Sequence, residues 1–271
     1  MLEGNRLLRY SRQLILKDVG AAGQEKLSIS KVLVIGAGGL GSPALFYLTA
    51  AGVGTIGAAD FDTVSISNLQ RQILYSSEDL QKRKVDVAVE KLKKLNPEVN
   101  VTKHGCRINA DNIEDIINGY DVVLDCCDNF SARYLISDCC HFMGKPLIEG
   151  AVTGFNGILM TIIPPKTPCY RCLYPEPPQG TAVPVCSDIG IMGMTAGTIG
   201  SLQALEAVKV LLGIGRTLSG RVIFFDGLDM SFREIMLEKN KSCRLCGENP
   251  SIRELSQYEM NYCKSKIENM D

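Results

Sequence analysis

Three sets of residues in this sequence have the types and spacing that binding or catalysis requires, and the first is a glycine cluster. The segment GAGGLG follows an apolar run and precedes a helical pattern, and it supplies Gly36, Gly38, Gly39 and Gly41. Glycines at such a turn let a phosphate approach the backbone, and the amides of the following helix attract the anion. Asp60 ends the next apolar run, where a carboxylate would accept ribose hydroxyls. These residues predict a nucleotide site, and a nicotinamide cofactor and ATP are both compatible with it.

Cations and amides after the second apolar run form the second set. The long polar connection carries Asn68, Arg71 and Gln72, and Lys84 opens the next helix. A polyphosphate requires cations and amides that converge on it, whereas a nicotinamide requires a neutral or aromatic surface. Charges near helix starts are also common on solvated surfaces, but this combination favours ATP.

A carboxylate for a metal ion follows the fourth predicted strand, in LDCCDN. Asp128 is placed to hold Mg²⁺ against phosphate oxygens with Asn129 beside it, whereas Asp125 could equally be a helix cap or a structural acceptor. The chain has no G-x-x-x-x-G-K-[ST] loop, which disfavours γ-phosphoryl transfer, and its two histidines, His104 and His141, are isolated. A carboxylate nucleophile is ionised above about pH 4 and needs no histidine base. The inferred chemistry is acyl-adenylate formation at the α-phosphate with loss of pyrophosphate.

The third set consists of four cysteines in two CxxC pairs. The segments CYRC and CRLC place them at Cys169, Cys172, Cys243 and Cys246. Two such pairs supply the four thiolates of a tetrahedral zinc site, and with no coordination position left open the zinc would be structural. A disulfide pair or an iron–sulfur centre is the alternative. The chain has eleven cysteines, and the paired spacing indicates metal binding in a reducing compartment.

The other cysteines fall into two kinds. Cys186 lies in a proline-rich loop after the first pair, and a sulfur-handling role for it stays open because its pKa cannot be read from the sequence. The rest lie mostly on predicted strands and helices, where we expect small core residues. They are Cys106, Cys126, Cys127, Cys139, Cys140 and Cys263.

The elements that must position these residues alternate along the first 150 residues. An amphipathic helix is predicted from about Arg6 to Lys17. Short apolar strands follow at 31–36, 55–60, 100–104, 121–127 and 145–150. Helices begin near Gly41, Arg83, Asp111 and Phe130. Such alternation predicts an α/β fold with a doubly wound, Rossmann-like, mostly parallel sheet, whose carboxyl edge collects the nucleotide residues.

After residue 151 the pattern changes to an antiparallel C-terminal extension that carries the cysteine pairs. An antiparallel strand is predicted within 154–165, and a helix of small and apolar residues, expected to be buried, within 190–215. Two further strands are expected at 221–227 and 231–239.

The composition is that of a soluble globular protein, with 271 residues of which 45% are hydrophobic and 22% charged. The formal net charge of −1 gives no bulk attraction to nucleic acid, and the apolar runs are broken well before the length of a membrane span. Glu3 precedes the basic residues at the N-terminus, which therefore does not read as a signal peptide. We expect no nucleic-acid or membrane partner and a cytoplasmic location.

Seven motifs, in this order, resemble those of the MoeB/ThiF/HesA family, relatives of the ubiquitin-activating E1 enzymes. They are RYSRQLIL, GAGGLGS, ADFDTVSISNLQRQILY, LDCCDN, CYRCLYP, GSLQALEAVKVL and CRLCG, and they extend from Arg9 to Gly247. The resemblance implies an adenylyltransferase that uses Mg²⁺ and ATP on the C-terminal Gly-Gly of a ubiquitin-like sulfur carrier of the MoaD/ThiS type. It also implies a homodimer, a structural Zn²⁺ and a place in molybdopterin or thiamine biosynthesis.

The same resemblance assigns roles to individual residues. Gly41 would contact the nucleotide, Asp60 the ribose and Asp128 the magnesium ion. The phosphates would be contacted by Asn68, Arg71 and Lys84. Catalysis would then consist mainly of positioning and charge stabilisation.

The resemblance also bears on Arg12, Cys186 and the cations before Lys84. Arg12 resembles an arginine that reaches the ATP of the partner subunit, although alone it is one charge on an amphipathic helix. Cys186 matches a cysteine that carries sulfur in thiamine-type and eukaryotic relatives and is dispensable in molybdopterin-type relatives. Lys82 and Arg83 directly precede Lys84, so which of the three cations meets the phosphates is open.

We therefore expect a single E1-like adenylation domain over residues 1–271. It would consist of a nucleotide-binding half at 1–150, a zinc-bearing, carrier-binding half at 151–250 and a tail at 251–271. The alternatives are an NAD-dependent oxidoreductase, a related E1-like enzyme that acts on a tRNA or cysteine-pathway substrate, and a scaffold that has lost catalysis.

Overall fold

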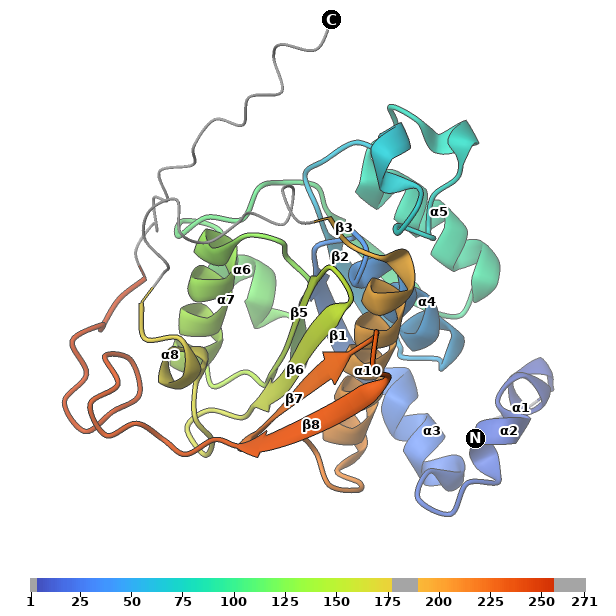
Figure 1. Cartoon of the computed structure of the whole chain (residues 1–271). Helices are drawn as coiled ribbons and strands as arrows, with labels where there is room; N and C mark the ends of the chain where they lie inside the picture. Colours follow the sequence, from blue (N-terminus) through green and yellow to red (C-terminus); the bar gives the residue numbers. More distant parts are fainter. Residues whose placement is uncertain (1–3, 177–189, 256–271) are drawn as a thin grey trace, which may run out of the picture.

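One eight-stranded sheet forms the centre of the molecule, which we describe from a computed structural model (Figure 1). The structure describes residues 4–176 and 190–255. The strand order is β3-β2-β1-β4-β5-β6-β7-β8, with parallel pairing from β3 to β5 and antiparallel pairing from β5 to β8. The predicted fold class, a doubly wound, mostly parallel sheet with an antiparallel extension, is confirmed.

The parallel part is built from the predicted alternation of strands and helices. Its strands are β1 (Lys31–Ile35), β2 (Thr55–Ala59), β3 (Asn100–His104), β4 (Val122–Asp125) and β5 (Leu147–Thr153). Its helices are α4 (Gly41–Ala50), α5 (Lys84–Leu95), α6 (Ile113–Asn118) and α7 (Phe130–Phe142), and the short 3₁₀ helices η1 (Ile66–Asn68) and η2 (Ser77–Asp79) precede α5. The chain leaves β1 toward β2 and later returns to its other side at β4. This reversal opens a crevice at the carboxyl edge, between the loops that follow β1 and β4.

The antiparallel part extends the same sheet. It comprises β6 (Asn156–Ile162), α8 (Tyr170–Leu173), α10 (Gly193–Leu212), β7 (Arg221–Asp226) and β8 (Ser231–Met236). β5 is the turning point, because it pairs in parallel with β4 and along its whole length in antiparallel with β6, from Leu147↔Ile162 to Thr153↔Asn156. In the described part of the chain no helix is long and apolar enough to cross a membrane.

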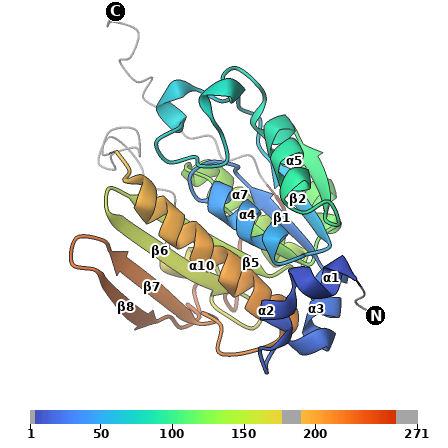
Figure 2. The ribbon, with the colours of Figure 1, turned by 90° about the vertical axis from the view of Figure 1, so that its right-hand side faces the viewer.

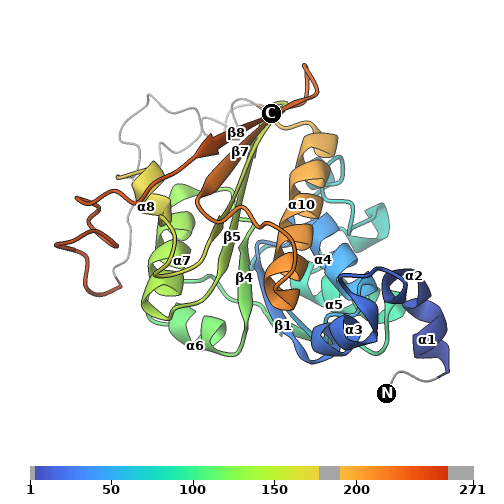
Figure 3. The same cartoon turned by 90° about the horizontal axis from the view of Figure 1, so that it is seen from below.

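Helices cover both faces of the sheet, so that the parallel part forms a three-layer structure (Figure 3). Successive side chains of β1 enter opposite cores: Val32 and Val34 pack into the core below α4 and α10, and Leu33 and Ile35 into the core below α6 and α7. Because side chains alternate between the faces of a strand, an unbroken apolar run is what a strand buried on both faces requires. Figure 2 shows α4 and α10 side by side on the first face.

The N-terminal segment differs from the single helix predicted over about 6–17. It forms two short helices, α1 (Asn5–Arg9) and α2 (Ser11–Leu14), and a third helix that the sequence did not predict, α3 (Gly20–Ile29). The break falls at Tyr10, which is 2% exposed and whose hydroxyl accepts a hydrogen bond from the Asn96 amide at 2.8 Å. Burial of this one ring bends a segment that the periodicity would have kept straight.

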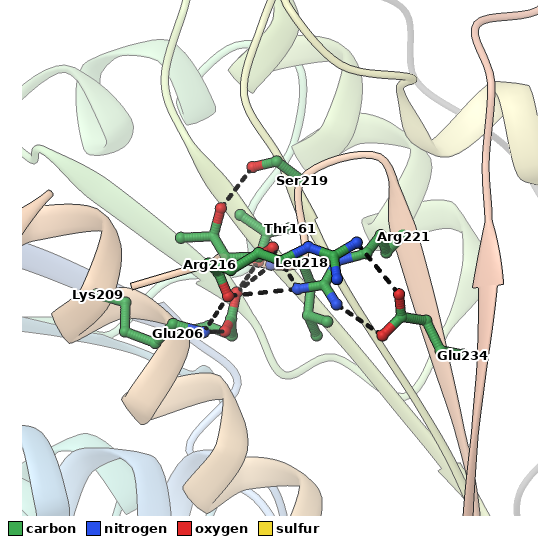
Figure 4. A network of polar contacts seen from close by, with 9 residues as sticks. Thr161, Glu206, Lys209, Arg216, Leu218, Ser219, Arg221 and Glu234 are labelled. Carbon is green, nitrogen blue, oxygen red and sulfur yellow. Dashed lines mark hydrogen bonds and ion pairs between the residues drawn. The ribbon is translucent and has the colours of Figure 1, made fainter. Parts of the chain in front are cut away.

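A buried polar network fixes the C-terminal part of α10 to the strands (Figure 4). One carboxylate oxygen of Glu206 accepts hydrogen bonds from the Thr161 hydroxyl and the Leu218 backbone N–H, each at 2.7 Å, and Lys209 pairs with the other oxygen. Glu206 is 4% exposed, so the helix, which was expected to be buried because its residues are small and apolar, also buries a carboxylate. Its hydrogen bonds compensate for its desolvation, as burial of a carboxylate requires.

Candidate active site

A cleft of about 1110 Å³ opens at the carboxyl edge of the parallel strands. The loops after β1, β2, β3 and β4 contribute to its wall, which is where ligands bind in doubly wound sheets. Most of the residues singled out from the sequence line it. They are Gly36, Gly38, Gly39, Asp60, Arg71, Gln72, Lys84, Asp128 and Asn129.

The glycine loop needs its glycines at two positions for packing. Gly36 has φ +96°, and a Cβ there would lie 2.6 Å from the carbonyl oxygen of Cys126. Gly41 is not among the residues that line the cleft, and a Cβ there would lie 1.9 Å from the carbonyl oxygen of Gly36. Gly41 therefore lets α4 start directly against the loop, which presents the backbone of Gly38 and Gly39 to the cleft.

Asp60 supports the glycine loop at the wall of the cleft. Its carboxylate accepts hydrogen bonds from the backbone N–H groups of Ala37 and Asp62, each at 2.9 Å. Lys84 lies 3.8 Å from the Asp60 carboxylate and 3.0 Å from that of Asp62. Burial raises the pKa of Asp60, and Lys84 and the two N–H groups oppose the shift. Asp60 thus fixes both the loop and the lysine at the edge of the cleft.

The structure separates the three consecutive cations before and at the start of α5. Lys84 is 4% exposed and lines the cleft. Lys82 lies 3.6 Å from the Asp79 carboxylate, and Arg83 donates to the carbonyl oxygen of Gly105. Of these three side chains, only Lys84 is among the residues that line the cleft.

The connection after β2 brings Arg71 and Gln72 to the cleft and leaves Asn68 behind them. Arg71 donates to the carbonyl oxygen of Ser67 at 3.0 Å, and the buried Oε1 of Gln72 has no hydrogen-bond partner among the described residues. Asn68 is not among the lining residues, and its carbonyl oxygen accepts from the N–H groups of Arg71 and Gln72 at 3.1 and 2.9 Å. Asn68 therefore positions Arg71 and Gln72, the two residues that reach the cleft.

The turn after β4 carries Asp128 and Asn129 into the cleft. The Asn129 side chain caps α7 by accepting from the Ala132 N–H at 2.9 Å. Asp125 is fully buried and accepts from the Cys127 N–H at 2.8 Å. Of the two roles left open by the sequence, Asp125 takes that of a structural acceptor, and Asp128 is the carboxylate that faces the cleft.

Several residues that line the cleft were not predicted from the sequence, although sequence features point to two of them. Arg133 follows Asn129, the N-cap of α7, by four residues, which is about one helical turn. Asp62 follows Asp60 on the same loop. A segment after β3 reaches the same edge because the carboxyl ends of parallel strands meet there, and it contributes Cys106, Arg107, Ile108, Asn109, Ala110 and Asp111.

Arg12 is exposed and is not among the residues that line the cleft. It lies on α2, in an N-terminal segment that also exposes apolar side chains. These are Leu7, Leu8, Ile15, Leu16 and Ile29.

The four predicted cysteine ligands meet in one cluster. The sulfur atoms of Cys169, Cys172, Cys243 and Cys246 lie within 4.8 Å of one another. Three of the separations are 3.9, 3.5 and 3.4 Å, and Zn–S bonds of about 2.3 Å in a tetrahedron place sulfurs about 3.8 Å apart. Hydrogen bonds from the Cys169 and Cys246 thiols, and from the Asn240 N–H, lower the pKa of Cys172. The donor set therefore fits a closed tetrahedral zinc site.

The remaining cysteines follow the expectation of core residues only in part. Cys126, Cys139 and Cys140 are buried, but Cys106 is exposed because it lies in the loop after β3 rather than on the strand. Cys127 is half-buried and lines the cleft. Cys186 and Cys263 lie outside the described residues.

The chain matches a family model described as the ThiF family over residues 10–245. It is 46% identical to the "Sulfur carrier protein adenylyltransferase" of Thermus thermophilus over 93% of this chain and 94% of that protein. It is 43% identical to the "SAMP-activating enzyme E1" of Haloferax volcanii over 95% and 96% of the two chains.

Two further similarities concern only part of the other protein. The chain is 43% identical to "Adenylyltransferase and sulfurtransferase MOCS3" of Culex quinquefasciatus, of which it spans 62%. The crystal structure of Escherichia coli MccB with ATP has a TM-score of 0.77 at 22% identity, over 88% of this chain and 74% of that one. This second similarity supports the fold alone.

Proposed function

Because the chain belongs to the ThiF family, we propose that it is an ATP-dependent adenylyltransferase that activates the C-terminal glycine of a ubiquitin-like sulfur-carrier protein. The observation that carries this proposal is the cleft, where a glycine loop, Asp60, Arg71, Lys84 and Asp128 converge at the carboxyl edge of the sheet. The names of the full-length relatives support adenylylation of a sulfur carrier. The carrier's pathway would be molybdopterin or thiamine biosynthesis, as the sequence resemblance implies.

The residues of the cleft suit attack on an α-phosphate. The carrier's terminal carboxylate attacks the α-phosphorus, the bond to the bridging oxygen breaks, and pyrophosphate leaves with that oxygen. Arg71 and Lys84 would offset the charge that develops on the phosphate oxygens, and removal of one such group typically lowers kcat about 10²- to 10³-fold. A glycine tail suits a narrow cleft because it has no side chains. No proton needs to be abstracted from a carboxylate nucleophile, which agrees with a cleft not lined by histidine among the described residues.

Asp128 and Asn129 would hold Mg²⁺ at the end of β4. The donor set fits, because carboxylate and amide oxygens at a cleft edge are the ligands that this ion prefers. When bound, the ion neutralises phosphate charge. Arg71 and Lys84 orient the same phosphates from the opposite loops.

The cysteine cluster would hold a structural Zn²⁺. Its four sulfurs leave no position for a substrate, and its residues come from the first turn of α8 with its N-cap and from the segment after β8, which are far apart in the sequence. The ion would therefore tie the C-terminal segment to the body of the protein.

A homodimer would complete the site with Arg12. This arginine is exposed on α2 and does not reach the cleft of its own chain. The exposed leucine and isoleucine side chains of the same N-terminal segment favour burial against a second copy. In such a dimer, Arg12 would reach the nucleotide of the partner subunit.

The carrier would dock on the antiparallel half of the sheet. All residues of β8 are exposed, among them Phe232, Ile235 and Met236, and the hairpin before it exposes Leu228 and Met230. An apolar surface of this kind suits a protein partner. Cys186 would handle sulfur if the protein works as the thiamine-type or eukaryotic relatives do, and would be dispensable if it works as the molybdopterin-type relatives do.

Carrier-dependent exchange of pyrophosphate into ATP tests the proposal. We expect exchange with a MoaD-type or a ThiS-type carrier and a loss of at least about 10²-fold in Asp128→Ala, because a metal ligand at the phosphates is removed. Glu78→Gln, which removes an exposed carboxylate, is the matched control and should retain full exchange. Exchange at the wild-type rate in Asp128→Ala would contradict the assigned site. Exchange with neither carrier would favour a different substrate for the same adenylation.

A further inference from the structure

Two buried carboxyl groups lie side by side directly behind the turn that carries Asp128. Asp125 on β4 and Glu149 on β5 are partners in the parallel register, so their side chains leave the sheet on the same face. They are 0% and 3% exposed. Arg133 of α7, 6% exposed, forms an ion pair with Glu149. Two carboxylates and one guanidinium would leave an uncompensated negative charge in the interior, which is costly.

Within residues 4–176 and 190–255, two of the four carboxyl oxygens of Asp125 and Glu149 accept a hydrogen bond from a donor, and two do not. One Asp125 oxygen accepts from the Cys127 N–H, and one Glu149 oxygen accepts from Arg133. The second oxygen of each carboxyl finds no donor among the described residues. The parallel register places the two side chains next to each other, so a hydrogen bond between these two oxygens would satisfy both. Two carboxylate oxygens can form such a bond only when a proton lies between them.

We propose that Asp125 and Glu149 share one proton, and that the neutral group they form with Arg133 positions the turn that carries Asp128 into the cleft. Asp125 holds the N–H of Cys127, and Arg133 donates to the carbonyl oxygen of the same residue. Arg133 also donates to the carbonyl oxygen of Gly150 on β5 at 2.8 Å. The peptide groups on both sides of Cys127 are thus fixed to two strands and one helix. The link to catalysis rests on the function proposed above, whereas the shared proton does not.

The groups around the pair are compatible with a proton held there. Burial, followed by the charge of Asp125, raises the pKa of Glu149 well above its ordinary value, and Arg133 only partly offsets this shift. Burial alone would lower the pKa of Arg133, but Glu149 and Asp125 outweigh it and raise that pKa. The titratable groups facing the pair or its turn are Cys126, Cys127, Asp128, Arg133, Cys140, Tyr170 and Tyr174. Burial raises the pKa of the three thiols and the two tyrosines, so these groups stay neutral near pH 7.

The shared proton predicts a specific dependence of unfolding on pH. The unfolded chain releases the proton above about pH 5, where ordinary Asp and Glu side chains are ionised, while the folded pair keeps it. Stability is therefore lost as the pH rises toward the folded pKa, and the unfolding constant gains about a factor of ten per pH unit from this pair.

Equilibrium urea unfolding of the full chain tests this between about pH 6 and pH 8. Below the folded pKa of the pair, Glu149→Gln should remove a dependence of about tenfold per pH unit relative to wild type, because the amide needs no shared proton. Asp125→Asn should remove the same dependence, and the double variant should remove no more. The surface variant Glu78→Gln should keep the wild-type dependence. Unfolding constants for both pair variants that remain in a fixed ratio to wild type would overturn the shared proton.

The positioning role is tested by pyrophosphate exchange. Glu149→Ala deprives Arg133 of its anchor, and we expect kcat to fall at least about tenfold with a smaller change in the KM for ATP, because misplacement of a reacting group acts on the chemical step. Glu149→Gln should recover most of this loss, because its amide oxygen still accepts from Arg133. A Glu149→Ala variant with wild-type kcat would overturn the positioning role. Absence of exchange in the wild-type protein would instead count against the proposed function and leave the unfolding test valid.

Discussion

The buried ion pair between Asp138 and Arg171 attaches the cysteine cluster to the helix that leaves the cleft. The Arg171 guanidinium donates two hydrogen bonds to the Asp138 carboxylate, each at 2.9 Å, and lies 4.6 Å from the ring centre of Tyr134. The two side chains are 2% and 0% exposed. Arg171 stands between Cys169 and Cys172, and Asp138 belongs to α7, which starts directly after Asn129.

Asp138→Asn keeps the shape of the side chain and removes its charge. Loss of one partner of a buried pair costs about 3–5 kcal/mol, because the remaining charge stays desolvated without its counter-charge. The amide oxygen can still accept one of the two hydrogen bonds, so we expect the lower end, about 3 kcal/mol. The same change should also loosen the cysteine cluster, because Arg171 lies within its first pair.

Equilibrium urea unfolding at saturating Zn²⁺ measures the free energy, and competition with a chelator measures retention of the ion. Glu90→Gln, which breaks the exposed pair with Lys94, is the matched control and should leave both readings unchanged. The double variant Asp138→Leu with Arg171→Met should be less destabilised than Asp138→Asn, since it leaves no buried charge. A loss below about 1 kcal/mol in Asp138→Asn, the range of exposed pairs, would refute the argument.

Three further outcomes are expected. Cys172→Ser should lower the affinity for zinc and the stability together, because the ligand set becomes incomplete, as followed by zinc content and thermal unfolding; unchanged zinc retention would contradict the site. Arg12→Ala and Asp128→Ala should each be inactive alone. After the two variants have exchanged subunits, their mixture should recover about a quarter of the wild-type rate of pyrophosphate exchange, since half of the dimers then contain one intact site. No recovery would place Arg12 outside the partner's site. Glu206→Ala should lower the free energy of unfolding in urea by about 2–4 kcal/mol, because buried donors such as the Thr161 hydroxyl lose their acceptor. Glu206→Gln should lower the free energy of unfolding by less. Equal losses in the two variants would rule out the polar network as the cause.

The sequence pattern alone predicted the sheet, the edge at which the cleft opens and nine of the residues that line it. Strands buried on both faces require unbroken apolar runs, so the strand over 31–35 could be predicted from its apolar run. The residues that follow such runs, among them Gly36, Asp60 and Asp128, lie at one edge because parallel strands all end there. The two CxxC pairs likewise predicted the cluster, because ligand spacing is local within each pair.

The tertiary structure decided what depends on contacts between distant segments. Only the fold shows that Lys84, and not Lys82 or Arg83, lines the cleft. Lys84 pairs with Asp60, and Arg83 donates to the carbonyl oxygen of Gly105, so the partners of both come from other segments of the chain. Burial of Tyr10 against Asn96 likewise divides a helix that local periodicity left continuous.

The pairing of Asp125 with Glu149 was also beyond the sequence. These residues are 24 positions apart, and their register follows from how β4 pairs with β5. Sequence pattern records which faces are apolar, whereas the environment of a buried charge is set by whichever segments the fold brings against it.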